Sequence, residues 1–278
     1  MSVTAILGGS PEEAAPQLDT AAAFAKRLNT KLNGLLAMPE PGNAFMYVAG
    51  PEMVMTGSAG IEAVIKAQDE AAKNMKDAFE DACTRAGPDL QTSFQREKGS
   101  VAAHAASAAM LSDALVFPRR SAHSDHALNP AFEHVLMQAR MPLVLAGDEE
   151  PLNGPCVIAW DGSPHAARAL RLHMPLIRAI GSVVIAQNPE KLEANRQIGK
   201  AVSPKELADW LHEEPISART VTMEGPISEG LLQVARENEA SLIVMGAYGH
   251  NRLGEMLFGG TSRAILNTTE GPAIAVAH

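Results

Sequence analysis

Aromatic residues make up only 4% of the 278-residue chain, and there are two cysteines, Cys83 and Cys156. The scarcity of aromatics argues against a sandwich with an aromatic core and favours helices packed closely on a sheet. Two cysteines cannot form a disulfide framework, so we expect two reduced thiols in a cytoplasmic protein.

The chain also lacks long apolar runs and an excess of positive charge. No 18 apolar residues follow one another without a charge, so we expect no membrane span, and residues 1–10 do not resemble a signal peptide. The formal net charge of −9 disfavours non-specific binding to nucleic acid and to anionic membranes. A length of 278 residues favours two domains over one.

Short apolar runs alternate with amphipathic stretches along the whole chain, which predicts parallel strands joined by right-handed helical crossovers. The strands expected in the first half are Thr4 to Leu7, Lys31 to Met38, Leu90 to Phe94, Ala114 to Phe117 and Pro142 to Ala146. Those expected in the second half are Cys156 to Trp160, Ser182 to Ala186, Thr220 to Met223, Leu242 to Met245 and Ala273 to Val276.

The two halves repeat the same order of elements. Gly9-Ser10-Pro11 aligns with Gly162-Ser163-Pro164, and each Ser-Pro pair predicts a helix N-cap followed by a first-turn proline. The first half is longer, and a Met-rich insertion near residues 39–58 accounts for most of the excess. This insertion fits a lid, a subunit interface or a segment packed on its own domain. We therefore predict a duplicated domain, residues 1–147 and 154–278, with the boundary in the breaker-rich stretch 147–155.

Glycines cluster after the fourth strand of the second half, at Gly246, Gly249, Gly259 and Gly260. Glycine lets a backbone approach a ligand closely, and successive backbone N–H groups in such a turn form a concavity that binds anions. Thr261 follows where the next helix begins and adds a hydroxyl. Because open α/β sheets bind ligands beyond the carboxyl ends of their strands, this stretch is a candidate phosphate site.

Asp161 after the first strand, Glu224-Gly225 after the third, and the Gly-x-x-Gly-x9-Gly spacing after the fourth resemble the universal stress protein family. The resemblance covers residues 154–278 and is weaker over the first half. It implies an α/β fold of the adenine nucleotide alpha hydrolase-like type. In this fold, each half forms an open five-stranded parallel sheet with helices on both faces.

The resemblance also implies binding of an adenine nucleotide, usually ATP, together with Mg²⁺. Carried over to this chain, Asp161 would contact the nucleoside, Met245 would lie against the nucleotide, and Gly246, Gly249 and Gly259 would line the phosphates. One position departs from the family pattern, because Gly259 is followed by Gly260 where ATP-binding members have Ser or Thr, and Thr261 comes one place later. Asp161 also fits a turn or helix-cap residue equally well.

The first half departs further from the pattern. Gly8 stands at the position of Asp161, and Pro118, Ser121 and Asn129 replace Gly246, Gly249 and Gly259. Proline removes a donor and side chains narrow the cradle, so we predict that this half binds no nucleotide in the same manner.

Other polar residues of the chain give weaker signals. Arg119 and Arg120 fit solvated surface arginines better than an anion site. His123 and His126 have a metal-ligand spacing but no obvious further ligands, so an ordinary loop pair is the better interpretation. His250 fits a phosphate contact and a solvated loop residue equally.

No nucleophile–base pair and none of the common catalytic motifs is present in the sequence, which favours nucleotide binding without efficient catalysis. Two alternatives stay open: a slow ATP hydrolase, and an interaction protein that binds no nucleotide and whose halves pair through their fifth strands. In each case the two halves form an internal pseudo-dimer, to which a further copy of the chain or an unidentified protein partner can be added.

Overall fold

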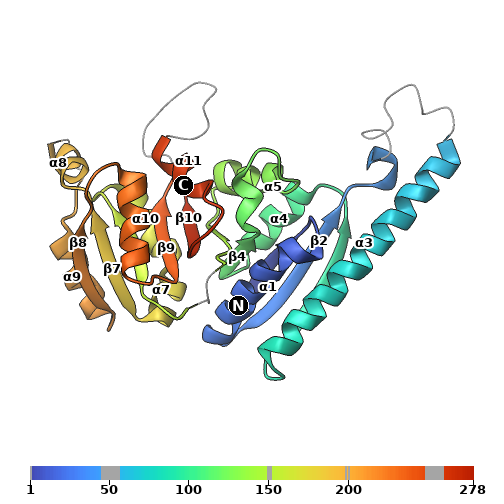
Figure 1. Cartoon of the computed structure of the whole chain (residues 1–278), viewed down its shortest axis with the longest axis horizontal. Helices are drawn as coiled ribbons and strands as arrows, with labels where there is room; N and C mark the ends of the chain where they lie inside the picture. The colour runs from blue at the N-terminus through green and yellow to red at the C-terminus, as the bar shows by residue number, and fades with distance from the viewer. Residues whose placement is uncertain (1, 45–56, 149–151, 198, 200, 248–259) are drawn as a thin grey trace.

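The computed structural model describes residues 2–44, 57–148, 152–197, 199, 201–247 and 260–278. Within them, ten strands form a single sheet in the order β3-β2-β1-β4-β5-β10-β9-β6-β7-β8. Every neighbouring pair is parallel except β5 and β10, which run antiparallel in the middle of the sheet. The expected α/β fold with two five-stranded parallel sheets is confirmed, and the two sheets join edge to edge through their fifth strands (Figure 1).

The strands of the first half are β1 Ser2–Leu7, β2 Lys31–Met38, β3 Thr92–Lys98, β4 Ala114–Phe117 and β5 Leu143–Leu145. Those of the second half are β6 Cys156–Trp160, β7 Ser182–Gln187, β8 Ser217–Thr222, β9 Leu242–Gly246 and β10 Ala273–Ala277. The central strands are almost entirely buried, as parallel strands covered on both faces must be.

Helices cover both faces of the sheet. One face carries α1 Pro11–Arg27, α3 Gly57–Ala86, α6 Pro164–Leu172, α7 Met174–Ile180 and α9 Pro204–Glu213, which share one hydrophobic core. The other carries α4 Val101–Ala109, α5 Asn129–Glu133, the π-helix η3 His134–Gln138, α10 Ile227–Glu237 and α11 Gly260–Leu266 over a second core. Two short elements, the 3₁₀-helix η2 Arg119–Ala122 and α8 Pro189–Gln197, follow β4 and β7.

The predicted helix starts are confirmed at both Ser-Pro pairs. Ser10 accepts a hydrogen bond from the Glu13 N–H, and Ser163 accepts one from the Ala166 N–H, so each serine caps its helix. The helix expected after Pro164 ends at Leu172, and a second helix begins at Met174 with Pro175 in its first turn. Because proline lacks an N–H, it favours this break.

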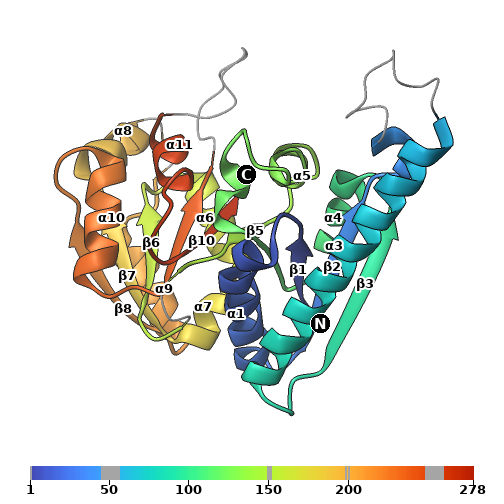
Figure 2. The ribbon, with the colours of Figure 1, turned by 45° about the vertical axis from the view of Figure 1, so that its right-hand side comes forward.

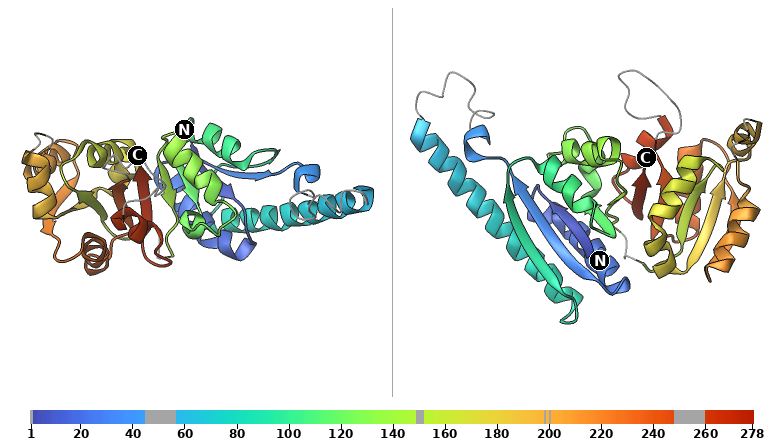
Figure 3. Two further views of the ribbon diagram at one scale, coloured as in Figure 1. Left: turned by 90° about the horizontal axis from the view of Figure 1, so that it is seen from above. Right: turned by 180° about the vertical axis from the view of Figure 1, so that it is seen from behind.

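The molecule is elongated along the sheet, with α3 and β3 at one end and α8, α9 and β8 at the other (Figure 2). The N-terminal part of α3 projects beyond the sheet, as the view from above shows (Figure 3). The insertion predicted near residues 39–58 lies mostly outside the described residues, since residues 45–56 are not described. No helix in the described part of the chain is long and apolar enough to cross a membrane.

Candidate functional site

The predicted site of the second half lies where β6 and β9 are neighbours. The strand order reverses direction between these two strands, so their connections leave towards opposite faces. Asp161 follows β6 and Gly246 ends β9, which brings both to the same edge of the sheet. This is the place where open α/β sheets bind ligands.

Asp161 has a structural role in its own loop. One oxygen of its half-buried carboxylate accepts a hydrogen bond from the Ser163 N–H at 2.9 Å, and its backbone carbonyl accepts one from Asn195 at 2.8 Å. The turn-residue interpretation of Asp161 is therefore confirmed. A contact between Asp161 and a nucleoside stays a prediction.

The segment after α8 lies over the carboxyl end of β6. The indole N–H of Trp160 donates to the Val202 carbonyl at 2.9 Å, and the Val202 N–H donates to the Gly162 carbonyl at 3.2 Å. Gly162 adopts φ +75°, and a β-carbon there would lie 2.9 Å from the Val202 carbonyl oxygen. A side chain at position 162 would therefore separate the loop from this segment.

Gly246 and Met245 are set by packing. A β-carbon at Gly246 would lie 2.9 Å from the backbone of His165, so only glycine lets the end of β9 lie against α6. The Met245 side chain is buried in the core beneath the sheet edge. Sequence reasoning did not foresee His165 or His278, whose rings stack at 6.2 Å, with His278 close to the Ala247 carbonyl.

Gly260 and Thr261 form the start of α11, and both are exposed. Among the described residues, a β-carbon at Gly260 would meet no atom within 4 Å. The predicted contacts Gly249 and Gly259, and His250 beside them, lie outside the described residues.

In the first half, protein side chains fill the place that corresponds to the predicted nucleotide site of the second half. A β-carbon at Gly8 would lie 2.9 Å from the side chain of Leu128, which is itself buried. The segment between β4 and α5 folds compactly, and Asn129 donates to the Ser121 carbonyl across it. This filling supports the prediction that the first half binds no nucleotide in the manner of the second.

The expectation of two solvated arginines is wrong for Arg119. Its half-buried guanidinium donates to the carbonyl oxygens of Thr268 and Pro272 in the second half, at 2.9 and 2.7 Å, because β5 and β10 pair beside it. Arg120 is exposed and pairs with Glu13 and Asp125. The described residues contain no group of three or more His, Cys, Asp or Glu that could hold a metal ion, and His126 is buried.

Strand order and helices on both faces define an open α/β protein, and the candidate site lies where the strand order reverses. Residues 153–277 match the sequence model of the universal stress protein family. The second half of the chain is therefore similar to that family.

Solved structures extend the likeness of fold to the whole chain. A universal stress protein from Archaeoglobus fulgidus DSM 4304 covers 99% of this chain and 97% of its own, with a TM-score of 0.66 and 15% identity. A proposed universal stress protein from Pseudomonas aeruginosa UCBPP-PA14 covers 100% and 93%, with a TM-score of 0.51 and 13% identity. At these identities the likeness is one of fold alone. A search of curated proteins found no match.

Proposed function

We propose that the chain is a tandem universal stress protein, with domains 1–147 and 154–278, whose second domain binds an adenine nucleotide. The observation that carries this proposal is the family match over residues 153–277, which contain the predicted contacts. Asp161 and Gly246 lie at one sheet edge, which supports a ligand site there. The two free thiols suit a reducing compartment such as the cytoplasm.

The residues that the structure describes fit an ATP molecule in part. No described atom would lie within 4 Å of a β-carbon at Gly260, and Thr261 is exposed beside it, which supports access of phosphate to backbone N–H groups and a hydroxyl. Asp161 would hold the nucleoside through the carboxylate oxygen that does not accept the hydrogen bond from the Ser163 N–H. Mg²⁺ would come with the phosphates, and binding would stabilise one conformation of the chain.

A first experiment is mass spectrometry of nucleotide released from freshly purified, denatured protein. About one ATP per chain would support a single site, and ADP or AMP would point to slow hydrolysis. Absence of released nucleotide, with no thermal shift on adding Mg-ATP, would contradict the proposal.

Two substitutions then test the site. Asp161→Asn keeps an oxygen for the Ser163 N–H but removes the charge, and we expect about tenfold weaker ATP binding in calorimetry. Gly260→Ser restores the hydroxyl directly after the third glycine of the family pattern, and we expect tighter binding because no described atom blocks a side chain there. Unchanged affinity in both variants would refute the site assignment.

Two observations favour a second function. The Asp161 carboxylate already accepts a hydrogen bond from the Ser163 N–H within its own loop, and Gly260 supplies no hydroxyl. Both suit an interaction protein that binds no nucleotide. Phosphate release above that of the Asp161→Asn variant would instead favour a slow ATP hydrolase.

A further inference from the structure

Val202 is an exposed apolar residue beside the turn that Asp161 begins. It directly precedes Ser203, the N-cap of α9, and is 45% exposed. An apolar residue in this place commonly packs on the fourth residue of the helix. That residue is Leu207, which is itself buried in the core. Because nearly half of Val202 stays exposed, the start of α9 leaves an apolar surface unused at the edge of the candidate site.

The backbone of Val202 is fixed on both sides. Its carbonyl accepts from the Trp160 indole N–H at 2.9 Å, and its N–H donates to the Gly162 carbonyl at 3.2 Å. The next residue, Ser203, forms a capping box with Glu206, because each side chain accepts a hydrogen bond from the other residue's backbone N–H, at 3.2 and 2.8 Å. The exposed side chain of Val202 is therefore held in place by residues of the turn and of α9.

Helix α8 adds a second contact to the same turn. Asn195 donates to the Asp161 carbonyl at 2.8 Å, and Leu192 is 7% exposed. A β-carbon at Gly162 would lie 3.0 Å from Cδ1 of Leu192, so this leucine lies directly against the turn. Figure 2 shows α8 at the same end of the second half as α11, where the phosphate contacts are predicted. Apolar side chains thus surround the turn on the side of α8 and α9.

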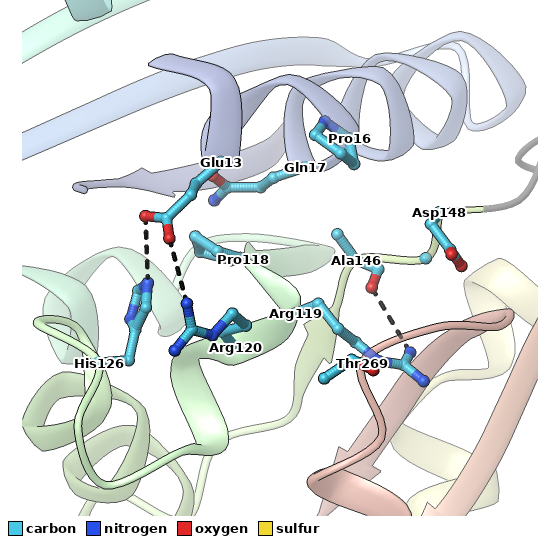
Figure 4. Close-up of a pocket in the computed structure, with 11 residues that line it drawn as sticks. Glu13, Pro16, Gln17, Pro118, Arg119, Arg120, His126, Ala146, Asp148 and Thr269 are labelled. Atoms are coloured by element: carbon cyan, nitrogen blue, oxygen red, sulfur yellow. Dashed lines mark hydrogen bonds and ion pairs between the residues drawn. The ribbon is translucent and has the colours of Figure 1, made fainter. Parts of the chain in front are cut away.

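The repeated turn of the first half has charged neighbours instead. Gly9 and Gly162 occupy the same place in the repeat, with φ +79° and +75°. A β-carbon at Gly9 would meet the Glu13 carboxylate and the His126 ring. Arg120 and His126 both point towards Glu13, as the close-up shows (Figure 4). A ligand would therefore meet charged groups beside the turn of the first half and an apolar surface beside that of the second.

An apolar surface next to a carboxylate suits one part of a nucleotide better than the other. The Asp161 oxygen that does not bind the Ser163 N–H can accept from a hydroxyl or an amino group. Its negative charge repels phosphate, and the only polar hydrogen of Val202, its N–H, is already used. Gly260 and Thr261, at the start of α11, provide the donors for phosphate. A nucleoside combines hydroxyl donors with a planar ring, so it fits beside the turn.

We propose that Val202 is the apolar wall on which the base of the bound nucleotide packs, and that Trp160 is its positioning residue. This inference rests on the proposed function and adds a residue that selects for the nucleoside rather than for the phosphates. Trp160 is 3% exposed and does not touch the ligand. It acts through its hydrogen bond to the Val202 carbonyl, which holds the wall beside Asp161.

Calorimetry on the full-length chain with Mg-ATP and with Mg-tripolyphosphate separates the two parts of the ligand. We expect Val202→Ser to weaken ATP binding about fivefold and to leave tripolyphosphate binding unchanged. Val202→Phe should tighten ATP binding about threefold, because an aromatic ring stacks on a base, and a folding defect cannot produce this gain. Leu172→Ser is the matched control, since Leu172 is 38% exposed at the far end of α6 from Asp161, and it should change neither affinity.

Trp160→Phe tests the positioning role, because it keeps a ring but removes the N–H. It should weaken ATP binding and not tripolyphosphate binding, whereas a general loss of structure would weaken both. If Trp160→Phe binds ATP like the parent chain, Trp160 does not position the wall. If Val202→Ser does so, the wall is refuted while nucleotide binding stands. A parent chain that binds tripolyphosphate as tightly as ATP would also refute the wall, and one that binds neither would overturn the proposed function with it.

Discussion

His173 is a buried residue whose protonation makes the stability of the fold depend on pH. It is 2% exposed, and its Nε2 donates to the Val276 carbonyl at 3.3 Å, which requires a proton on Nε2. Burial lowers its pKa from 6.5 to about 4. The unfolded chain therefore binds this proton at a higher pH than the folded chain. The contribution of His173 is complete above pH 6.5 and is lost as the pH falls towards 4.

We predict that this residue removes about 2 kcal/mol from the free energy of unfolding between pH 7 and pH 5. His173→Gln keeps a donor for the Val276 carbonyl but does not titrate, so the variant should lose that much less over the same range. Denaturant unfolding at both pH values checks this, and other ionisable groups cancel in the comparison. The same loss in both proteins would show that His173 is not the origin.

The packing of α6 on β9 depends on one glycine. Gly246→Ala places a β-carbon 2.9 Å from the His165 backbone, and neither the strand end nor the helix can yield without disturbing the core. We predict a loss of about 1–3 kcal/mol in the free energy of unfolding. Gly260→Ala is the control, since its β-carbon meets no described atom within 4 Å and a helix gains from alanine. If both variants are equally stable, the close contact at Gly246 is not what requires glycine.

At the scale of elements, the sequence predicts buried strands better than exposed ones. The ranges of β2, β4 and β6 are as predicted, because most of the residues in each are apolar and buried. The two edge strands were displaced: β8 is Ser217–Thr222 where residues 220–223 were expected, and β3 is Thr92–Lys98 where residues 90–94 were expected. Both edge strands are largely polar and exposed, so apolar runs beside them gave the wrong bounds.

The candidate site also has features that the sequence predicts and features that it does not. Chain order and strand ends placed Asp161 and Gly246 at one sheet edge, because parallel strands share their carboxyl edge. The contacts of Arg119 with the second half could not be predicted in this way. They depend on the pairing of β5 with β10, which brings the carbonyls of Thr268 and Pro272 beside this side chain, and no sequence motif shows that pairing.

The two halves of the molecule form one continuous sheet, but only a short strand pairing joins them within that sheet. β5 contributes three residues to its antiparallel pairing with β10, in the register Leu143↔Val276, Val144↔Ala275 and Leu145↔Ile274. Side chains add further connections. Arg27 donates to the Ala179 carbonyl at 2.7 Å, and Arg119 donates to carbonyls of the second half.

Arg119 is the most engaged of these connections. Its guanidinium donates to the carbonyls of Thr268, Glu270 and Pro272, all in the connection that leads into β10. A side chain without donors would leave these carbonyls unpaired in a partly buried place, while the strand pairing alone would hold the halves together. Replacing Arg119 by such a side chain should therefore weaken the coupling between the halves as well as lower the free energy of unfolding.

We predict that Arg119→Met lowers the free energy of unfolding by about 3 kcal/mol, since several charge-assisted hydrogen bonds are lost together. Arg120→Met is the matched control. Its exposed ion pairs with Glu13 and Asp125 should contribute less than about 1 kcal/mol. Denaturant unfolding should be followed by two probes. Tryptophan fluorescence reports on the second half, which contains Trp160 and Trp210, and far-ultraviolet circular dichroism reports on the whole chain. Together they distinguish a loss of stability from a loss of coupling between the halves. Coincident transitions in the parent chain that separate in Arg119→Met would show that this side chain couples the halves. If Arg119→Met unfolds like Arg120→Met, the paired strands hold the two halves together without it.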